Sequence, residues 1–188
     1  MSTTKKNNKS MMLLLAAVFI VPVLLAKLAL DNGWFNQGVT NKGELISPPI
    51  DINVLQTKQQ EPKWKLIYIL PQKCSLGCEN ALYSIAQVHS ALGKESDRAE
   101  VVVISHEQSN IEQLAELANK QNVRLLSSDL KSLQQVFKET PTDGIFIADT
   151  LNNVFLRYPL QIDKEQAILH SRDILADMRK VLKLSRIG

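Results

Sequence analysis

Cys74 and Cys78 are the two cysteines of the 188-residue chain, and their type and spacing point to chemistry more directly than any other feature. They follow the apolar run 64–70 and precede a segment of helical periodicity, which predicts a strand-to-helix turn. If this turn opens the helix, the i and i+4 side chains lie on one face about one turn apart. Such a pair can close a disulfide or bridge a single copper ion, because Cu(I) prefers soft thiolate ligands. The alternative is a structural disulfide or two unremarkable thiols.

The two sulfurs are not expected to be equivalent. Cys74 precedes the helix, where the positive end of the helix dipole favours a thiolate, and Lys73 adds a nearby cation. We therefore expect Cys74 to be the more acidic and more exposed thiol. Cys78, one turn inside the helix, would be the resolving thiol or the second metal ligand. Gly77 either relieves crowding between the sulfurs or is simply a residue at a helix start.

Three histidines are candidates for a further ligand or proton partner. His106 follows the apolar run 100–104. If that run is a strand parallel to the one before the cysteines, His106 and Cys74 emerge at the same carboxyl edge, where open α/β sheets place their ligands. His106 is therefore the candidate third metal ligand, with a solvated loop residue as the alternative. His89 is expected at the edge of the core, and His170 on the surface of the last helix.

An apolar N-terminal segment indicates where the thiols are located. Residues 1–10 contain three lysines and no acid, and the stretch 11–30 is apolar apart from Lys27. A helix of that length, at about 1.5 Å per residue, is roughly as long as a bilayer core is thick. We expect a transmembrane anchor at 11–30, with 1–10 in the cytoplasm and the remaining chain in the periplasm, because the lysine excess precedes the span. A cleaved signal peptide is the alternative, although no Ala-x-Ala site is present.

The composition argues against one class of partner. The formal net charge is +3 and the isoelectric point is near 8.8. After residue 60 the basic residues are interspersed with acids, with few aromatic residues for base stacking. A solvated mixed surface explains this pattern better than a nucleic-acid-binding surface does, so we expect no nucleic acid partner.

The chain after the anchor divides into a tether and a domain. Residues 31–62 are rich in turn-forming dipeptides and prolines, which predicts a tether. Its segment 45–55 has apolar residues that could lie along the domain as a strand, which its prolines would confine to an edge. Residues 63–188 suffice for one domain with its own core.

Strand and helix patterns alternate within this domain. Apolar runs predict strands at 66–70, 100–104, 123–126, 145–148 and 154–158. Helical periodicity predicts a helix that follows the cysteine turn and ends at Gly93, with apolar residues of 81–92 along one face, and further helices at 111–118, 129–137 and 163–184. The turn 149–153 joins the last two strands as a hairpin. This order predicts an α/β fold in which a mixed central sheet carries helices on both faces.

A dithiol turn after the first core strand, followed by a strand–helix–strand unit, a hairpin and a closing helix, resembles the thioredoxin fold over residues 64–184. Within it, the Cys74-x-x-x-Cys78 spacing resembles that of the Sco/SenC family, which are membrane-anchored copper-binding proteins of cytochrome c oxidase assembly. The hairpin 145–158 resembles the one before the final helix of that family. The resemblance implies copper as the metal, and cytochrome c oxidase subunits or assembly factors as partners.

The sequence also departs from the Sco/SenC pattern. Glu79 follows the second cysteine where that family has a proline, and 137–144 lacks the histidine ligand of the family. The same segment holds Thr140-Pro141-Thr142, which is similar to the cis-proline that faces the cysteines in thioredoxins. An ordinary trans loop proline is the alternative at Pro141.

These observations predict a single-pass inner-membrane protein that presents a thioredoxin-like domain to the periplasm and acts in cytochrome c oxidase biogenesis. Cys74 and Cys78 would keep the cysteines of a copper site in the reduced thiol form, or would carry Cu(I). Two other functions remain open: a general periplasmic thiol–disulfide oxidoreductase, and an assembly scaffold in which the cysteines form a structural staple.

Overall fold

The computed structural model describes residues 8–32, 40–56, 61–118 and 123–187. Its internal contacts divide the chain into two compact units, residues 1–40 and 41–188, and each is described by itself. The tether expected at 31–62 therefore contributes residues to both units.

The first unit is helix α1, Asn8–Asp31, with Pro22 in its interior. Its stretch Lys9–Asp31 is long and apolar enough to cross a membrane, and none of it is buried against other parts of the protein. This helix fits the single-pass anchor that the sequence predicts at 11–30. Most of the expected cytoplasmic segment, residues 1–7, lies outside the described residues.

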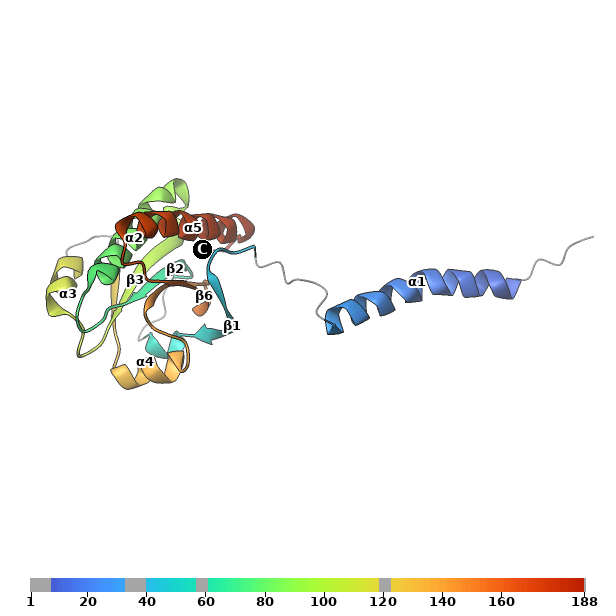
Figure 1. Ribbon diagram of the computed structural model, residues 1–188, viewed down its shortest axis with the longest axis horizontal. Coiled ribbons are helices and arrows are strands. Elements are labelled where there is room, and N and C mark those ends of the chain that lie inside the picture. Colours follow the sequence, from blue (N-terminus) through green and yellow to red (C-terminus); the bar gives the residue numbers. More distant parts are fainter. Residues whose placement is uncertain (1–7, 33–39, 57–60, 119–122, 188) are drawn as a thin grey trace, which may run out of the picture. The chain divides into compact units, whose positions relative to one another are not determined.

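The second unit alternates strands and helices (Figure 1). Its strands are β1 (Glu44–Asp51), β2 (Trp64–Ile69), β3 (Ala99–Ser105), β4 (Val123–Ser127), β5 (Gly144–Ala148) and β6 (Asn153–Pro159). Its α-helices are α2 (Leu76–Ala91), α3 (Ile111–Ala118), α4 (Leu130–Phe137) and α5 (Lys164–Leu184), and short 3-10 helices lie at Asn53–Leu55 and Gly93–Arg98.

The strands form one mixed sheet in the order β1-β6-β5-β2-β3-β4. Strands β2, β3 and β4 are parallel, whereas β5 is antiparallel to both β2 and β6, and β1 is antiparallel to β6. The predicted hairpin is therefore β5–β6. The predicted combination of parallel and antiparallel strands is confirmed.

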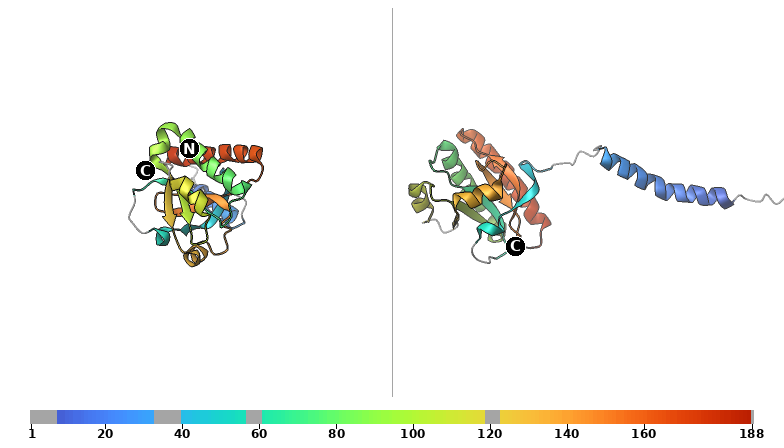
Figure 2. Two further views of the ribbon diagram at one scale, coloured as in Figure 1. Left: turned by 90° about the vertical axis from the view of Figure 1, so that its left-hand side faces the viewer. Right: turned by 90° about the horizontal axis from the view of Figure 1, so that it is seen from below.

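Helices cover both faces of this sheet, as predicted. One face packs against α2 and α5, which contact each other and lie side by side in both views of Figure 2. The other face packs against α4 and the 3-10 helix at Asn53–Leu55. Alternate residues of β2 belong to the two resulting cores, with Leu66 and Tyr68 in the first and Ile67 and Ile69 in the second.

The edge strand β1 comes from the segment expected to be a tether. It pairs with β6, and the register shifts between Leu45 and Ile50, where Pro48 and Pro49 remove two backbone donors. Prolines are tolerated there because β1 is the outermost strand of the sheet.

Asp177 on α5 holds Lys42 and Gly43, at the start of the second unit, in place. Its Oδ2 accepts hydrogen bonds from the Tyr158 hydroxyl at 2.6 Å and from the backbone N–H groups of Lys42 and Gly43 at 2.6 and 3.1 Å. Burial raises the pKa of the Tyr158 phenol, and its hydrogen bond to Asp177 raises it further, so the hydroxyl remains the donor. A Cβ on Gly43 would approach the Tyr158 ring to 2.6 Å, so only glycine fits at this contact.

We expect Asp177→Ala to lower the free energy of unfolding by roughly 3 kcal/mol, because it leaves three donors without their acceptor, two of them buried. Asp173→Ala, on the same helix, is the matched control and should change it by less than about 0.5 kcal/mol. Urea unfolding of the full-length chain in detergent measures both. Equal effects of the two substitutions would show that Asp177 does not hold the segment in place.

Candidate functional site

The segment that carries the cysteines is held at the carboxyl edge of the parallel strands. The N–H of Leu70 donates to the Ile104 carbonyl at 2.8 Å, which continues the pairing of β2 with β3. The carbonyl of Pro71 accepts the N–H of Asn110 at 3.1 Å, so the loop after β3 also holds this segment. The chain then turns and begins α2 at the predicted place.

Cys74 and Cys78 form a disulfide, with their Cα atoms 5.2 Å apart. Cys74 precedes the cap residue of α2, and Cys78 lies in the first turn of the helix. Cys78 is 0% exposed within the core between α2 and the sheet, whereas Cys74 is partly exposed and packs against the margin of that core. Of the two sulfurs, therefore, Cys74 is the one that lies nearer the surface.

Gly77 does not relieve crowding beside the disulfide. A Cβ built at this position would lie 3.6 Å from the Leu160 Cβ, which is an ordinary van der Waals contact. Of the two interpretations of Gly77, a residue at a helix start without a steric role fits the structure.

His106 lies directly after β3, at the edge where the parallel strands place it beside the cysteine segment. Its backbone N–H donates to the Ser109 hydroxyl at 2.9 Å, and that hydroxyl donates to the Leu70 carbonyl at 2.8 Å. The Nδ1 atom of His106 accepts the Gln108 N–H at 3.2 Å, so the neutral ring carries its proton on Nε2. In this arrangement the ring can donate a hydrogen bond but offers no free lone pair to a metal.

The other histidines have local partners. The Nε2 of His89 donates to the Ala99 carbonyl at 3.1 Å, at the edge of the core as expected. His170 is half-buried rather than on the open surface, because its ring packs edge-on against Tyr158 with the centroids 6.4 Å apart. Within the part of the chain that the structure describes, no three His, Cys, Asp or Glu side chains are grouped so as to hold a metal ion.

Arg157 on β6 holds the loop that leads into β5. It donates to the Pro141 carbonyl at 3.1 Å and forms ion pairs of 2.8 Å with Asp143 and with Glu44 of β1. Arg157 is not recognisable as such a residue from the sequence, because a single arginine in an alternating strand looks like a solvent-facing residue. Its role depends on three segments that are distant in the sequence.

The Pro141 peptide bond is trans, because the one cis peptide bond among the described residues is Ser47–Pro48. Of the two alternatives for Pro141, the ordinary trans loop proline is therefore the one observed.

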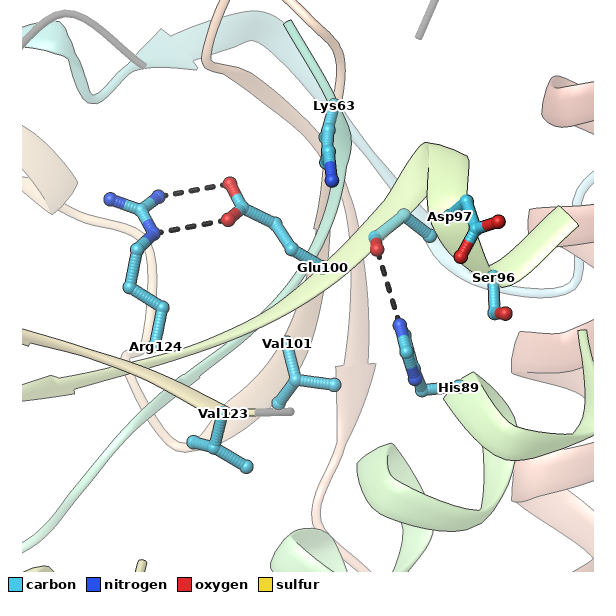
Figure 3. A pocket seen from close by; sticks show the side chains of 9 residues that line it. Lys63, His89, Ser96, Asp97, Glu100, Val101, Val123 and Arg124 are labelled. Atoms are coloured by element: carbon cyan, nitrogen blue, oxygen red, sulfur yellow. Dashed lines mark hydrogen bonds and ion pairs between the residues drawn. The ribbon is translucent and has the colours of Figure 1, made fainter. Parts of the chain in front are cut away.

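A second polar region lies at the opposite edge of the sheet, where β2 and β3 begin. A pocket of about 290 Å³ there is lined by Glu100, Arg124 and Lys63 among others (Figure 3). Arg124 donates two hydrogen bonds to Glu100, at 3.0 and 3.1 Å, and the Lys65 Nζ lies 3.6 Å from the same carboxylate. Burial lowers the pKa of the Lys65 ammonium, although Glu100 opposes this shift. These charges compensate one another, and the pocket is separate from the cysteine site.

Comparison with protein families gives a match over residues 64–185, to the family described as transmembrane-like, thioredoxin-like, C-terminal domain. The chain belongs to this family. The match covers the elements from β2 to α5 and confirms the thioredoxin-like fold that the order of elements predicts. No curated protein sequence matches the chain.

Solved structures with a similar fold include members of the Sco/SenC family. ScoI from Bradyrhizobium japonicum with copper bound is 20% identical, with a TM-score of 0.42, over 60% of this chain and 85% of that one. ScoI from Arabidopsis thaliana with copper bound is 15% identical, with a TM-score of 0.47, over 64% and 86%. A SCO1/SenC family lipoprotein from Bacillus anthracis is 15% identical, with a TM-score of 0.46, over 64% and 82%.

After reduction, Cys74 should react with an alkylating agent at neutral pH at least several-fold faster than Cys78. Cys74 is partly exposed and precedes the start of α2, whereas Cys78 is buried. Mass-mapped alkylation of the variants Cys74→Ser and Cys78→Ser, each with one remaining thiol, measures the two rates. Equal rates would contradict an activated Cys74.

Proposed function

We propose that the protein is a membrane-anchored periplasmic thiol protein that acts in cytochrome c oxidase biogenesis. In this role it reduces the disulfide between the cysteines of a copper site back to thiols, through Cys74 and Cys78. The observation that carries the proposal is the disulfide itself, in which Cys78 is buried beneath α2 and Cys74 is partly exposed at the carboxyl edge of a thioredoxin-like sheet. A buried sulfur beside a partly exposed one suits a resolving thiol beside an attacking thiol.

The exchange proceeds in two balanced steps. The Cys74 thiolate attacks a disulfide of the partner, which forms a mixed disulfide and releases one partner thiolate that takes up a proton. The Cys78 thiolate then attacks the Cys74 sulfur, closes the internal disulfide and releases the second partner thiol. The partner gains two electrons and two protons, and the protein loses them. A dithiol reductant in the same compartment must then return the protein to its reduced form.

Carriage of Cu(I) is the second candidate function for the same pair. Two thiolates are a donor set that suits Cu(I), but only in the reduced protein, because a disulfide has no thiolate to offer. His106 would have to give up the hydrogen bond that Nδ1 accepts from Gln108 before it could serve as a third ligand. Both functions require the reduced pair, so it is the occupied Nδ1 atom of His106 that favours the reductant over the carrier.

The assignment to oxidase biogenesis depends on the resemblance of the Cys74-x-x-x-Cys78 spacing to the Sco/SenC family. Partners would then be cytochrome c oxidase subunits or their assembly factors, reached beside the inner membrane in which α1 is anchored. A general periplasmic oxidoreductase would more often use a Cys-x-x-Cys pair. A scaffold would need only the disulfide as a staple, and it would tolerate the loss of both thiols.

We expect the N-terminus to be cytoplasmic and the domain periplasmic, because three lysines lie in residues 1–10, before the span. Alkaline phosphatase fused after Leu184 should therefore be active, because this enzyme folds only in an oxidising compartment. A fusion of a cytoplasmic reporter at the same position should be inactive. The opposite pair of results would reverse the topology.

The reduced full-length protein should bind one Cu(I), and Cys74→Ser or Cys78→Ser should abolish binding, because one thiolate leaves the soft ion without its second strong ligand. His106→Ala should weaken binding or slow disulfide exchange, whereas His170→Ala should do neither, since only His106 lies at the edge that carries the cysteines. Competition with a Cu(I) chelator and exchange with a model disulfide measure both activities.

The outcomes separate the candidate functions. If the parent protein binds Cu(I) no more strongly than a variant in which both Cys74 and Cys78 are replaced with serine, copper carriage is excluded and thiol exchange remains a candidate function. Unchanged behaviour of both histidine variants would remove His106 from the site. If the parent protein neither binds Cu(I) nor exchanges disulfides, the assembly scaffold is the one candidate function that remains.

A further inference from the structure

The two edge strands of the sheet differ in how they resist further pairing. Strand β1 forms one edge, where Pro48 and Pro49 remove backbone donors. Strand β4 forms the other edge, and its five residues include neither a proline nor a lysine, which commonly block pairing at an edge. Its one charged residue, Arg124, is already hydrogen-bonded to Glu100. Strand β4 is therefore the edge that can accept another strand.

The pairing of β4 with β3 determines which of its backbone groups point outward. Directly after β4, the N–H of Ser128 donates to the Ser105 carbonyl of β3 at 2.9 Å. Because backbone groups alternate in direction along a strand, the even-numbered residues of β4 face β3, and Val123, Leu125 and Ser127 point away from it. Among the residues that the structure describes, none forms a hydrogen bond with these outward groups.

An exposed apolar side chain lies at the middle of this edge. Leu125 is the central residue of β4 and is 37% exposed. Its side chain shares a face of the strand with Val123, which packs against the core beneath α2. Unused backbone donors and acceptors beside an exposed leucine suit a second β-strand as the partner.

We propose that β4 pairs in the antiparallel direction with β4 of a second copy of this chain, about a two-fold axis at Leu125. In this register Leu125 lies opposite the partner's Leu125, and Val123 lies opposite the partner's Ser127. All three outward residues then belong to pairs that exchange two hydrogen bonds each. The two Leu125 Cα atoms would be about 5.5 Å apart, and their side chains would cover each other.

The sequence of β4 is complementary to itself in this register. An axis at Arg124 would use fewer of the outward residues and would place Arg124 opposite the partner's Arg124, which is unfavourable. With the axis at Leu125, Arg124 lies opposite the partner's Leu126, and its charge is compensated by Glu100 through hydrogen bonds of 3.0 and 3.1 Å. The register that pairs every outward residue is thus also the one that brings no like charges opposite each other, which favours a second copy as the occupant.

A five-residue strand gives a small interface, so the dimer should be weak in dilute solution. Anchoring through α1 would confine the copies to one membrane and raise their effective concentration. The pairing does not involve Cys74 or Cys78, so this inference is independent of the proposed thiol function.

The first test is crosslinking of full-length protein in liposomes, with Cys74 and Cys78 replaced by serine and a single cysteine introduced as Leu125→Cys. Mild oxidation should join two copies, because about 5.5 Å between Cα atoms is within the range that a disulfide spans. Leu151→Cys, at a position 68% exposed in the turn before β6, is the matched control. We expect the Leu125→Cys dimer to form about tenfold faster than the Leu151→Cys dimer, as measured on non-reducing gels.

The second test keeps the native cysteines and compares Leu125→Lys with Leu151→Lys. Energy transfer between labelled copies, diluted with lipid, measures the dissociation constant. Leu125→Lys should raise this constant by about fivefold or more, because it removes the leucine contact and places two ammonium groups opposite each other. Leu151→Lys should leave it within about twofold of the parent.

Three results would overturn the inference. The first is a parent protein that stays monomeric at every dilution. The second is equal crosslinking at both positions, or a Leu125→Lys protein that dimerises like the parent, since the contact would then lie elsewhere. The third is crosslinking of Leu125→Cys to a different protein in native membranes, which would make this edge a site for a foreign strand.

Discussion

The burial of strand β2 on both faces is the constraint on which the rest of the structure depends. Alternate side chains of β2 enter two separate cores, so each face needs its own layer of helix. The chain that leaves β2 must therefore turn back over one face as α2, and the turn contains Cys74. The cysteines lie at the edge of the sheet because the core requires a reversal of the chain there.

This reversal also makes the two sulfurs different. Residues before the helix stay near the surface, whereas the first inward-facing residue of α2 is drawn into the core with Cys78. Oxidation state and packing are thereby coupled, since one member of the pair is part of the hydrophobic interior. Any reaction of the disulfide changes a group that belongs to the same core as Leu66 and Tyr68 of β2.

Two polar contacts hold the periphery of the domain in place around this site. Asp177 holds Lys42 and Gly43 against α5, and Arg157 joins Glu44 to the loop at Asp143. Both involve residues at the start of the folded unit, so part of the segment that looks like a tether is a structural component of the sheet. The edge strand β1 then covers the outer side of β6, where its prolines limit further pairing.

Local pattern alone determined the apolar anchor helix, the alternation of strands and helices, and the strand–turn–helix that carries Cys74 and Cys78. These features follow from hydrophobic periodicity and from turn residues within a few positions, so the sequence suffices to predict them. The parallel pairing of β2 and β3 could also be predicted from the sequence, and this pairing correctly placed His106 at the edge of the sheet. Only the tertiary structure decided that Gln108 occupies the Nδ1 atom of His106, and that Arg157 links three distant segments. It also decided that the Tyr68 hydroxyl has no hydrogen-bond partner in the part of the chain that the structure describes. The reason is that a hydrogen bond, or its absence, in a core depends on side chains that distant parts of the chain bring together, and no local pattern encodes that geometry.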